Sequence, residues 1–285
     1  MTDKTNYLFY ATNRLIELYD DLVQYALDDI VARILKNKVI TATAEYEIWK
    51  LQQMGLHLDK IIKYIKKTTK YSDQEIEHIF KTAGIGYYKA VARISIDYGH
   101  DKPLSLQTSE RMKNILEYYI KSTKGTVRNL TRTTAKSSQK ILIDKLDQVH
   151  FRVVSGMQSH TAAISEAVDE ISKSSLKVEY PSGHKDNVDV AVRRAVVTGV
   201  NKCYSDLNLI RAQETGYDYV LVSSHSGARH VENPNPTYAS HDLWQGKVYK
   251  VNWDTVPIAN NEDFGGRNYG QGTIERLANG HEAGY

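Results

Sequence analysis

The stretch that decides the fold is LFYATNRLIELYDDLVQYALDDI, residues 8–30. Its apolar residues recur mainly at intervals of three and four, as they do along one side of an α-helix. The residues on this side are Leu8, Leu15, Tyr19, Leu22, Ala26 and Ile30. No proline precedes Pro103, so nothing of that kind blocks helix propagation in the first hundred residues. The sequence therefore predicts a long, mainly helical N-terminal body.

Breaks in this helical body are predicted from local signals. We expect a helix over about 44–55 to end near Gly55, and a new helix to start at Ser72, because Ser72 and Glu75 form a capping-box pattern. Two short helices with a tight joint are also compatible with a helix-turn-helix. Nothing here marks a recognition helix, so a plain helical hairpin is the simpler interpretation. Helical patterns resume over 110–122 and 155–177.

The C-terminal part has a different character. Nine of the 17 glycines follow residue 215, and YPSG (180–183) is a turn signal. A helix is expected after this turn, and its apolar side consists of Val192, Val196, Gly199, Cys203, Leu207 and Ile210. Strand-like runs, YDYVLVS (217–223) and the end of WQGKVY (244–249), flank a loop. The predicted fold class is α+β, with a short β-sheet in a small C-terminal domain.

These patterns divide the chain into three parts. We expect a helical domain over 1–122, a basic helical stalk over 123–180, and an α+β domain over 181–285. Cys203, the only cysteine, lies on the apolar side of its helix and is expected in the core. Another side of that helix is uniformly polar and could contact a backbone or face solvent. Its residues are Arg194, Thr198, Asn201, Ser205 and Asn208.

The segment 121–152 is basic. Eight Lys and Arg side chains face only Asp144 and Asp147, an excess of six positive charges, whereas the whole chain carries +3. As a helix, this segment could neutralise phosphates without reading bases. The alternative is an ordinary solvated helix of a stalk, and the residue pattern leaves both open. The candidate DNA contacts are Lys121, Lys124, Arg128, Arg132, Lys136 and Lys140.

From about Leu130 to Val251, the sequence resembles the phage minor capsid protein 2 family, which is similar to head morphogenesis proteins of the Mu protein F type. The resemblance rests on NLTRTTA (129–135), YPSG, AVRRAVVTGVN (191–201), VSSHSGAR (222–229) and WQGKVY. The last two carry most weight, because runs of unusual residues agree in order and type. Two departures are the insertion HVENPNPTYAS (230–240) and the absence of a Cys-Arg-His motif near the end.

This resemblance implies a structural minor capsid protein of a tailed bacteriophage. Such a protein is bound at the portal inside the head and acts in head assembly or in genome packaging and ejection. The implied partners are the portal protein, with scaffold protein, major capsid protein and packaged double-stranded DNA as further candidates, and no cofactor is implied. The implied location is the virion, after assembly in the host cytoplasm. The family pattern points to Arg193, Arg194, Thr198 and Asn201 in a helix, and to His225, Gly227, Arg229, His241, Trp244, Gln245 and Gly246 in loops.

Catalytic readings of the same loops are weaker. His225, His230 and His241 could bind zinc, but no HExxH or CxxC motif accompanies them, so we expect no metal. Ser224 and His225 are adjacent in a strand-like run and would point to opposite faces. We therefore expect no enzyme. A DNA-binding module remains the first alternative, and a metal-dependent enzyme or effector fused to a head protein remains the second.

Targeting and membrane signals are also weak. The opening segment MTDKTNYLFYATNRLIELYDD lacks the apolar centre of a signal peptide, and no run of eighteen uninterrupted apolar residues occurs. We therefore expect neither export by the ordinary secretory route nor a membrane partner.

Overall fold

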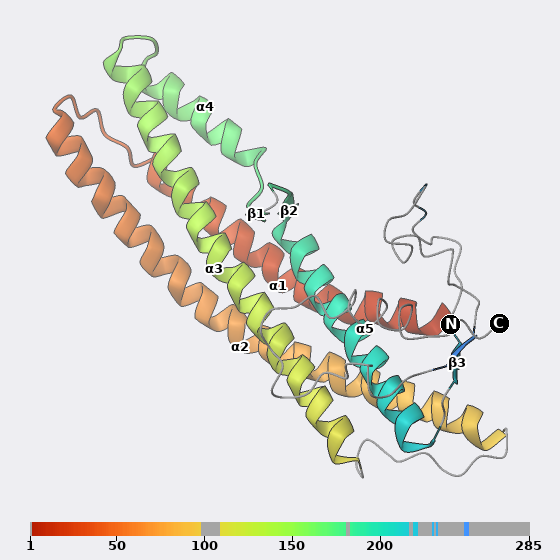
Figure 1. Ribbon diagram of the computed structural model, residues 1–285. Helices are drawn as coiled ribbons and strands as arrows, with labels where there is room; N and C mark the ends of the chain where they lie inside the picture. The colour runs from red at the N-terminus through yellow and green to blue at the C-terminus, as the bar shows by residue number, and fades with distance from the viewer. Residues whose placement is uncertain are drawn as a thin grey trace. The chain divides into compact units, whose positions relative to one another are not determined.

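The computed structural model describes residues 2–97, 109–180, 183–216, 219–221, 230, 232 and 248–250. These ranges contain five helices and four short strands (Figure 1). The helices are α1 (Thr2–Ile34), α2 (Thr43–Asp97), α3 (Glu110–Val154), α4 (His160–Ser172) and α5 (Val188–Glu214). The strands are β1 (Lys177–Glu179), β2 (Lys185–Asn187), β3 (Tyr219–Leu221) and β4 (Val248–Lys250).

The chain forms two compact units, each assembled from segments that are distant in sequence. The first consists of Met1–Ile79 and Ser122–Thr198, and the second of Phe80–Lys121 and Gly199–Tyr285. The three-part division at 122 and 180 therefore stays a prediction. Within the described ranges, no helix is both long enough and apolar enough to cross a membrane.

The core of the first unit is built on the apolar side of α1. Leu8, Leu15, Tyr19, Leu22, Ala26 and Ile30 are all buried, which confirms the predicted stripe. α1 packs against α4, whose Ala163, Ala167 and Ile171 are buried. From α3, Leu142 and Leu146 are completely buried. The helical N-terminal body is thus confirmed for the described residues.

The two breaks predicted between residues 44 and 84 are wrong, because α2 is one continuous helix of 55 residues. Gly55 lies inside it, since a glycine costs an exposed helix only about 1 kcal/mol, too little to end it. Ser72 caps nothing, because its side chain is buried and lies 3.4 Å from the Tyr19 hydroxyl, which donates to it. The helix-turn-helix alternative is therefore wrong as well, because it required a turn between two helices in this segment.

α3 confirms the helix predicted from residue 110 through the basic segment. The helix expected over 155–177 is shorter than predicted: α4 covers only His160–Ser172, because a loop separates it from α3 and β1 begins at Lys177. Gly156 has a φ of +73°, which suits glycine, and the Ser159 side chain then caps α4 by accepting a bond from the Ala162 amide at 3.3 Å.

Tyr180 and Gly183, the two ends of the predicted YPSG turn, lie at the bend of a hairpin, and Pro181 and Ser182 lie outside the described residues. β1 and β2 pair antiparallel, with Val178 opposite Asp186. The Tyr180 amide donates to the His184 carbonyl at 2.9 Å, and Gly183, with a φ of +81°, donates to the Tyr180 carbonyl at 2.8 Å. α5 begins directly after this hairpin, and its predicted apolar side is buried throughout, Cys203 included.

In the second unit, α3 and α5 are joined by polar contacts. The Tyr119 hydroxyl donates to Asp206 at 2.8 Å, and the Ser109 hydroxyl donates to Glu214 at 2.9 Å. β3 and β4 pair antiparallel, with Val220 opposite Tyr249, as expected for the two strand-like runs. The described residues are therefore mainly helical with two short antiparallel strand pairs, and the α+β arrangement of 181–285 as a whole stays a prediction.

Candidate functional site

Arg193 and Arg194, the family-motif arginines, are held by different partners. The Arg193 guanidinium donates to the Asn13 side chain on α1 at 3.0 Å. Arg194 Nη1 lies 2.7 Å from Asp186 Oδ2 in β2. Since successive residues point about 100° apart around a helix, the first arginine ties α5 to α1 and the second ties α5 to the hairpin.

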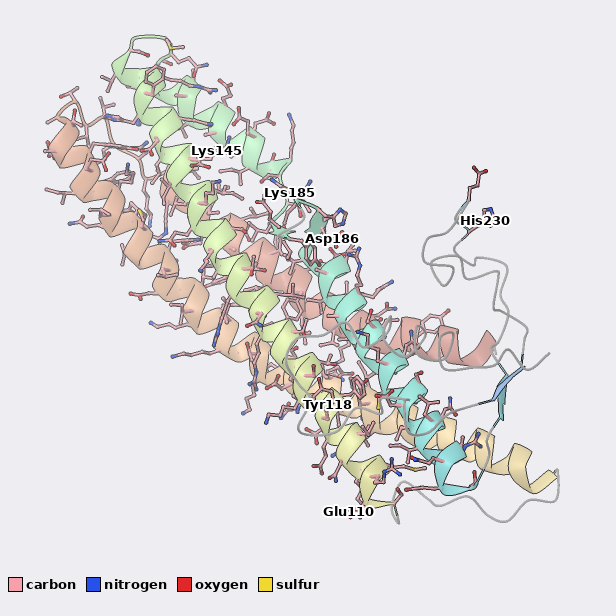
Figure 2. The ribbon with its side chains drawn as sticks, in the orientation of Figure 1. Glu110, Tyr118, Lys145, Lys185, Asp186 and His230 are labelled. Carbon is pink, nitrogen blue, oxygen red and sulfur yellow. The ribbon has the colours of Figure 1, made fainter. Side chains whose placement is uncertain are left out.

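Asp186 is the centre of this hairpin joint (Figure 2). Its side chain is only 9% exposed and lies between Arg194 and His184, whose Nε2 is 2.9 Å away. Burial alone would raise the pKa of Asp186, but the His184 hydrogen bond and the Arg194 charge together hold that pKa below its ordinary value. Asp186 is therefore ionised, and its ion pair with Arg194 connects β2 to α5. This geometry indicates a structural role.

Thr198 and Asn201, the other family-motif residues of α5, are exposed. Arg194 and Ser205, on the same polar side of the helix, are exposed too, and Asn208 is half-buried. The described part of the chain does not cover this side from Arg194 to Ser205. A buried polar contact, if it forms, therefore requires a partner outside the described residues.

The family-motif loop residues lie outside the described residues. They are His225, Gly227, Arg229, His241, Trp244, Gln245 and Gly246. His230 is described and exposed. Within the described ranges, no group of three or more histidine, cysteine, aspartate or glutamate side chains is placed to hold a metal ion. The predictions for these loops, including the low-ranked zinc site, stay predictions.

The basic segment is largely neutralised by carboxylates from other helices. On the α2 side, Lys124 pairs with Glu77 at 2.8 Å, and Arg128 pairs with Asp73. Toward α4, which runs beside the end of α3 (Figure 2), Arg152 Nη1 lies 2.8 Å from Glu166, and Lys145 pairs with Glu170. These four carboxylates reduce the excess of six positive charges in the segment to two, and Lys50 on α2, which pairs with Asp147 at 2.9 Å, raises it again to three.

Three basic residues in the middle of the segment remain exposed. Arg132, Lys136 and Lys140 are spaced four residues apart, so they share one side of α3. Lys121 is exposed as well and belongs to the second unit. The candidate DNA contacts thus separate into ion-paired residues, Lys124 and Arg128, and a short exposed row of three.

A buried polar network between α1, α2 and α3 was not predicted from the sequence. At its centre, Asp29 on α1 accepts from Arg33 Nε at 2.6 Å, from Lys60 Nζ at 2.8 Å, and from His57 Nδ1 at 2.8 Å. The opposite ring nitrogen of His57 lies 3.2 Å from the Ser138 hydroxyl on α3. One signal was available, since Asp29 sits beside Ile30 on the apolar side of α1.

The network sets the charge state of its members. Burial would raise the pKa of Asp29, but the three donors lower it below its ordinary value. Burial lowers the pKa of His57 by more than the neighbouring Asp29 raises it, so the ring is neutral near pH 7. Because a carboxylate only accepts, Nδ1 carries the ring proton.

Asp29, His57 and Ser138 are linked in the order acid, histidine, serine, as in a catalytic triad. The Ser138 hydroxyl nevertheless cannot act as a nucleophile. Ser138 and His57 are 0% exposed, so no substrate reaches the hydroxyl oxygen. The hydroxyl has one proton, and the Ala135 carbonyl, 2.8 Å away, competes with His57 Nε2 to accept it. We therefore interpret the network as structural: it links three helices through a single buried carboxylate.

Comparison with known proteins agrees with the resemblance seen in the motifs and extends it. A family described as phage minor capsid protein 2 matches residues 4–281. A relative described as a structural protein of Lactococcus phage LL-H is 22% identical over 199 residues, which cover 67% of this chain and 53% of the relative. This chain therefore spans about half the length of that relative. No solved structure matches the chain. The family match includes both the helical body and the motif-bearing C-terminal part, and the chain belongs to the phage minor capsid protein 2 family.

Proposed function

We propose that this protein is a minor structural component of a tailed-phage virion, bound at the portal vertex inside the head and acting in head assembly or in genome packaging and ejection. The observation that carries the proposal is the family match across residues 4–281. The proposed partner is the portal protein, with scaffold and major capsid proteins as further candidates. Assembly would take place in the host cytoplasm.

The described geometry supports a structural role. Within the first unit, α2 and α3 are each held laterally by buried polar bonds. The Tyr19 hydroxyl on α1 lies 3.0 Å from Thr131 on α3, in the NLTRTTA motif. These contacts link residues far apart in sequence within the first unit and suit a structural role.

Cross-linking in purified virions tests the portal proposal. Intact virions, heads without tails, and heads lacking the portal are separated by density and treated with a short lysine-reactive cross-linker. Mass spectrometry should find this protein in the first two and joined to the portal protein. Recovery of equal amounts from portal-free heads contradicts a portal position, and absence from all particles contradicts a virion role.

A second candidate function is contact with packaged DNA. The exposed row Arg132, Lys136 and Lys140 favours it, because three cations on one side of a helix can lie along a phosphate backbone. The ion pairs of Lys124 and Arg128 limit it, because those side chains are already matched by carboxylates.

Filter binding to linear double-stranded DNA tests this candidate. If three side chains each neutralise one phosphate, affinity should fall about 40-fold between 50 and 200 mM salt. Changing Arg132, Lys136 and Lys140 to Gln should remove binding at 50 mM salt. A matched control changes Lys63, Lys67 and Lys70, exposed on α2, to Gln and removes the same charge. Equal losses in both variants, or no binding by the wild type, exclude a DNA contact at this row.

A further inference from the structure

α2 carries an apolar stripe that the described chain leaves largely uncovered, with only Leu58 and Ile65 half-buried. The side chains of Ile48 and Leu51 are each 60% exposed, and Ile62 is 39% exposed. The stripe alternates spacings of three and four, the pattern by which two helices interlock. Its members are Ile48, Leu51, Gly55, Leu58, Ile62 and Ile65. It lies about a third of a turn from the side of α2 that faces the core, where His57 and Ile61 are buried.

Gly55, in the middle of this stripe, has no role that the described chain explains. Glycine destabilises a helix interior by about 0.5–1 kcal/mol relative to alanine. A Cβ at Gly55 would meet nothing within 4 Å, so no described neighbour requires its absence. A missing side chain on an exposed apolar stripe leaves a recess that a large side chain from another helix can fill.

We infer that this stripe binds the same stripe of a second copy of the chain, with the two α2 helices antiparallel about a twofold axis between residues 56 and 57. In this register Ile48 lies opposite Ile65, and Leu51 lies opposite Ile62 of the other copy. Gly55 lies opposite Leu58, so the recess in each helix receives a leucine. All six positions find an apolar counterpart, as an isologous contact requires.

The charges beside the stripe select the antiparallel direction. Glu45 and Lys66 lie on the solvent side of the stripe at its two ends, and both are exposed. Antiparallel docking brings Glu45 of each copy near Lys66 of the other, whereas a parallel pair in register would keep these two side chains about 30 Å apart along the helix axis. Between them, Gln52 meets Asp59 without repulsion. This inference concerns self-association and does not depend on a position at the portal.

Sedimentation of the full chain with single substitutions tests the apolar part. The wild type should form dimers at micromolar concentration. Leu51→Glu should weaken dimerisation on the order of 100-fold, because the axis places the new charge in the contact twice. The matched control is Leu56→Glu on the other flank of α2, where Leu56 is 55% exposed, and it should dimerise as the wild type does.

Helical content by circular dichroism shows whether each variant is folded. A second test changes the charge pair Glu45 and Lys66 and leaves the apolar stripe intact. Glu45→Lys and Lys66→Glu should each weaken dimerisation about fivefold at low salt, and the double variant should restore it. A monomeric wild type at all concentrations overturns the inference. Equal behaviour of Leu51→Glu and Leu56→Glu, or no restoration in the double variant, overturns it as well.

Discussion

The two sides of α2 differ in which residues they bury and which they expose. The side that faces α1 and α3 buries polar groups among apolar ones, since His57, Thr68 and Ser72 are at most 3% exposed and lie along the helix with buried Ile61 and Ile76. The adjacent stripe exposes large aliphatic side chains, such as Ile48 and Leu51. Both sides obey helical spacing, so periodicity alone does not say which one faces the core. Contacts with α1 determine which side of α2 is buried. Asp29 and Tyr19 on α1 hydrogen-bond to His57 and Ser72, so the side that carries these polar groups can be buried with its groups satisfied.

The two sides of α2 also differ in the kind of contact they can make. An apolar stripe accepts many partners with small energetic differences, whereas a buried polar group accepts only those that satisfy it. The inward side of α2 therefore fixes the register of the three helices, and the outward side is left for association.

The largest effect is expected from Asp29→Ala. The substitution leaves buried Arg33 without its carboxylate and removes the partner of His57, and breaking a buried ion pair costs about 3–5 kcal/mol. Chemical denaturation followed by circular dichroism measures the loss. The control is Asp28→Ala one residue earlier, where the exposed carboxylate should contribute less than about 0.5 kcal/mol. Comparable losses in the two variants would show that the network does not stabilise the fold.

A smaller and pH-dependent effect is expected from His57. Its pKa is lowered in the folded state by burial, with Asp29 acting in the opposite direction and Arg33 and Lys60 adding to the decrease. The unfolded chain therefore binds a proton first as the pH falls below about 6.5, and stability is lost by at most about 1.4 kcal/mol per pH unit. Denaturation midpoints of the wild type and His57→Gln between pH 7.5 and 5 should converge toward low pH. Parallel curves would assign the pH dependence elsewhere.

Tyr19→Phe should cost about 1 kcal/mol, because it removes one hydroxyl that bridges Ser72 and Thr131 while keeping the ring. Thermal unfolding would register the change, and the control Tyr71→Phe should be nearly neutral, because Tyr71 is 48% exposed. If Tyr19→Phe leaves stability unchanged, the hydroxyls of Ser72 and Thr131 would satisfy each other's hydrogen-bonding capacity. The polar side of α2 would then be less selective than its geometry indicates.

Much of the helical architecture could be predicted from the sequence, and the errors have a common cause. The apolar stripes of α1 and α5 were found because a single dominant face gives a clear period. The breaks at Gly55 and Ser72 were wrong because local signals are worth about 1 kcal/mol, whereas the tertiary contacts along α2 outweigh that. Ser72 in particular resembles a cap in sequence and is a buried acceptor in the structure.

The candidate site was less accessible to sequence reasoning. A count of charges within 121–152 could not include Glu77, Asp73 and the two α4 glutamates, which approach only in the fold. The Asp29 network joins residues up to 109 positions apart, so no local motif could reveal it. The family resemblance, by contrast, could be recognised without a structure, because it depends only on the order of residues in the sequence.

The smallest effect on stability is expected from Arg194→Ala. This arginine is about half exposed, and an exposed ion pair contributes about 0–1 kcal/mol, even though Asp186 itself is nearly buried. His184 also keeps a hydrogen bond to that carboxylate in the variant. Thermal unfolding should therefore change little. Incorporation of the variant into virions, measured by quantitative mass spectrometry, then separates two roles. A normal level agrees with a brace within the chain. A strong loss with unchanged stability would mean that the exposed polar side of α5, from Arg194 to Ser205, is a contact for another virion protein.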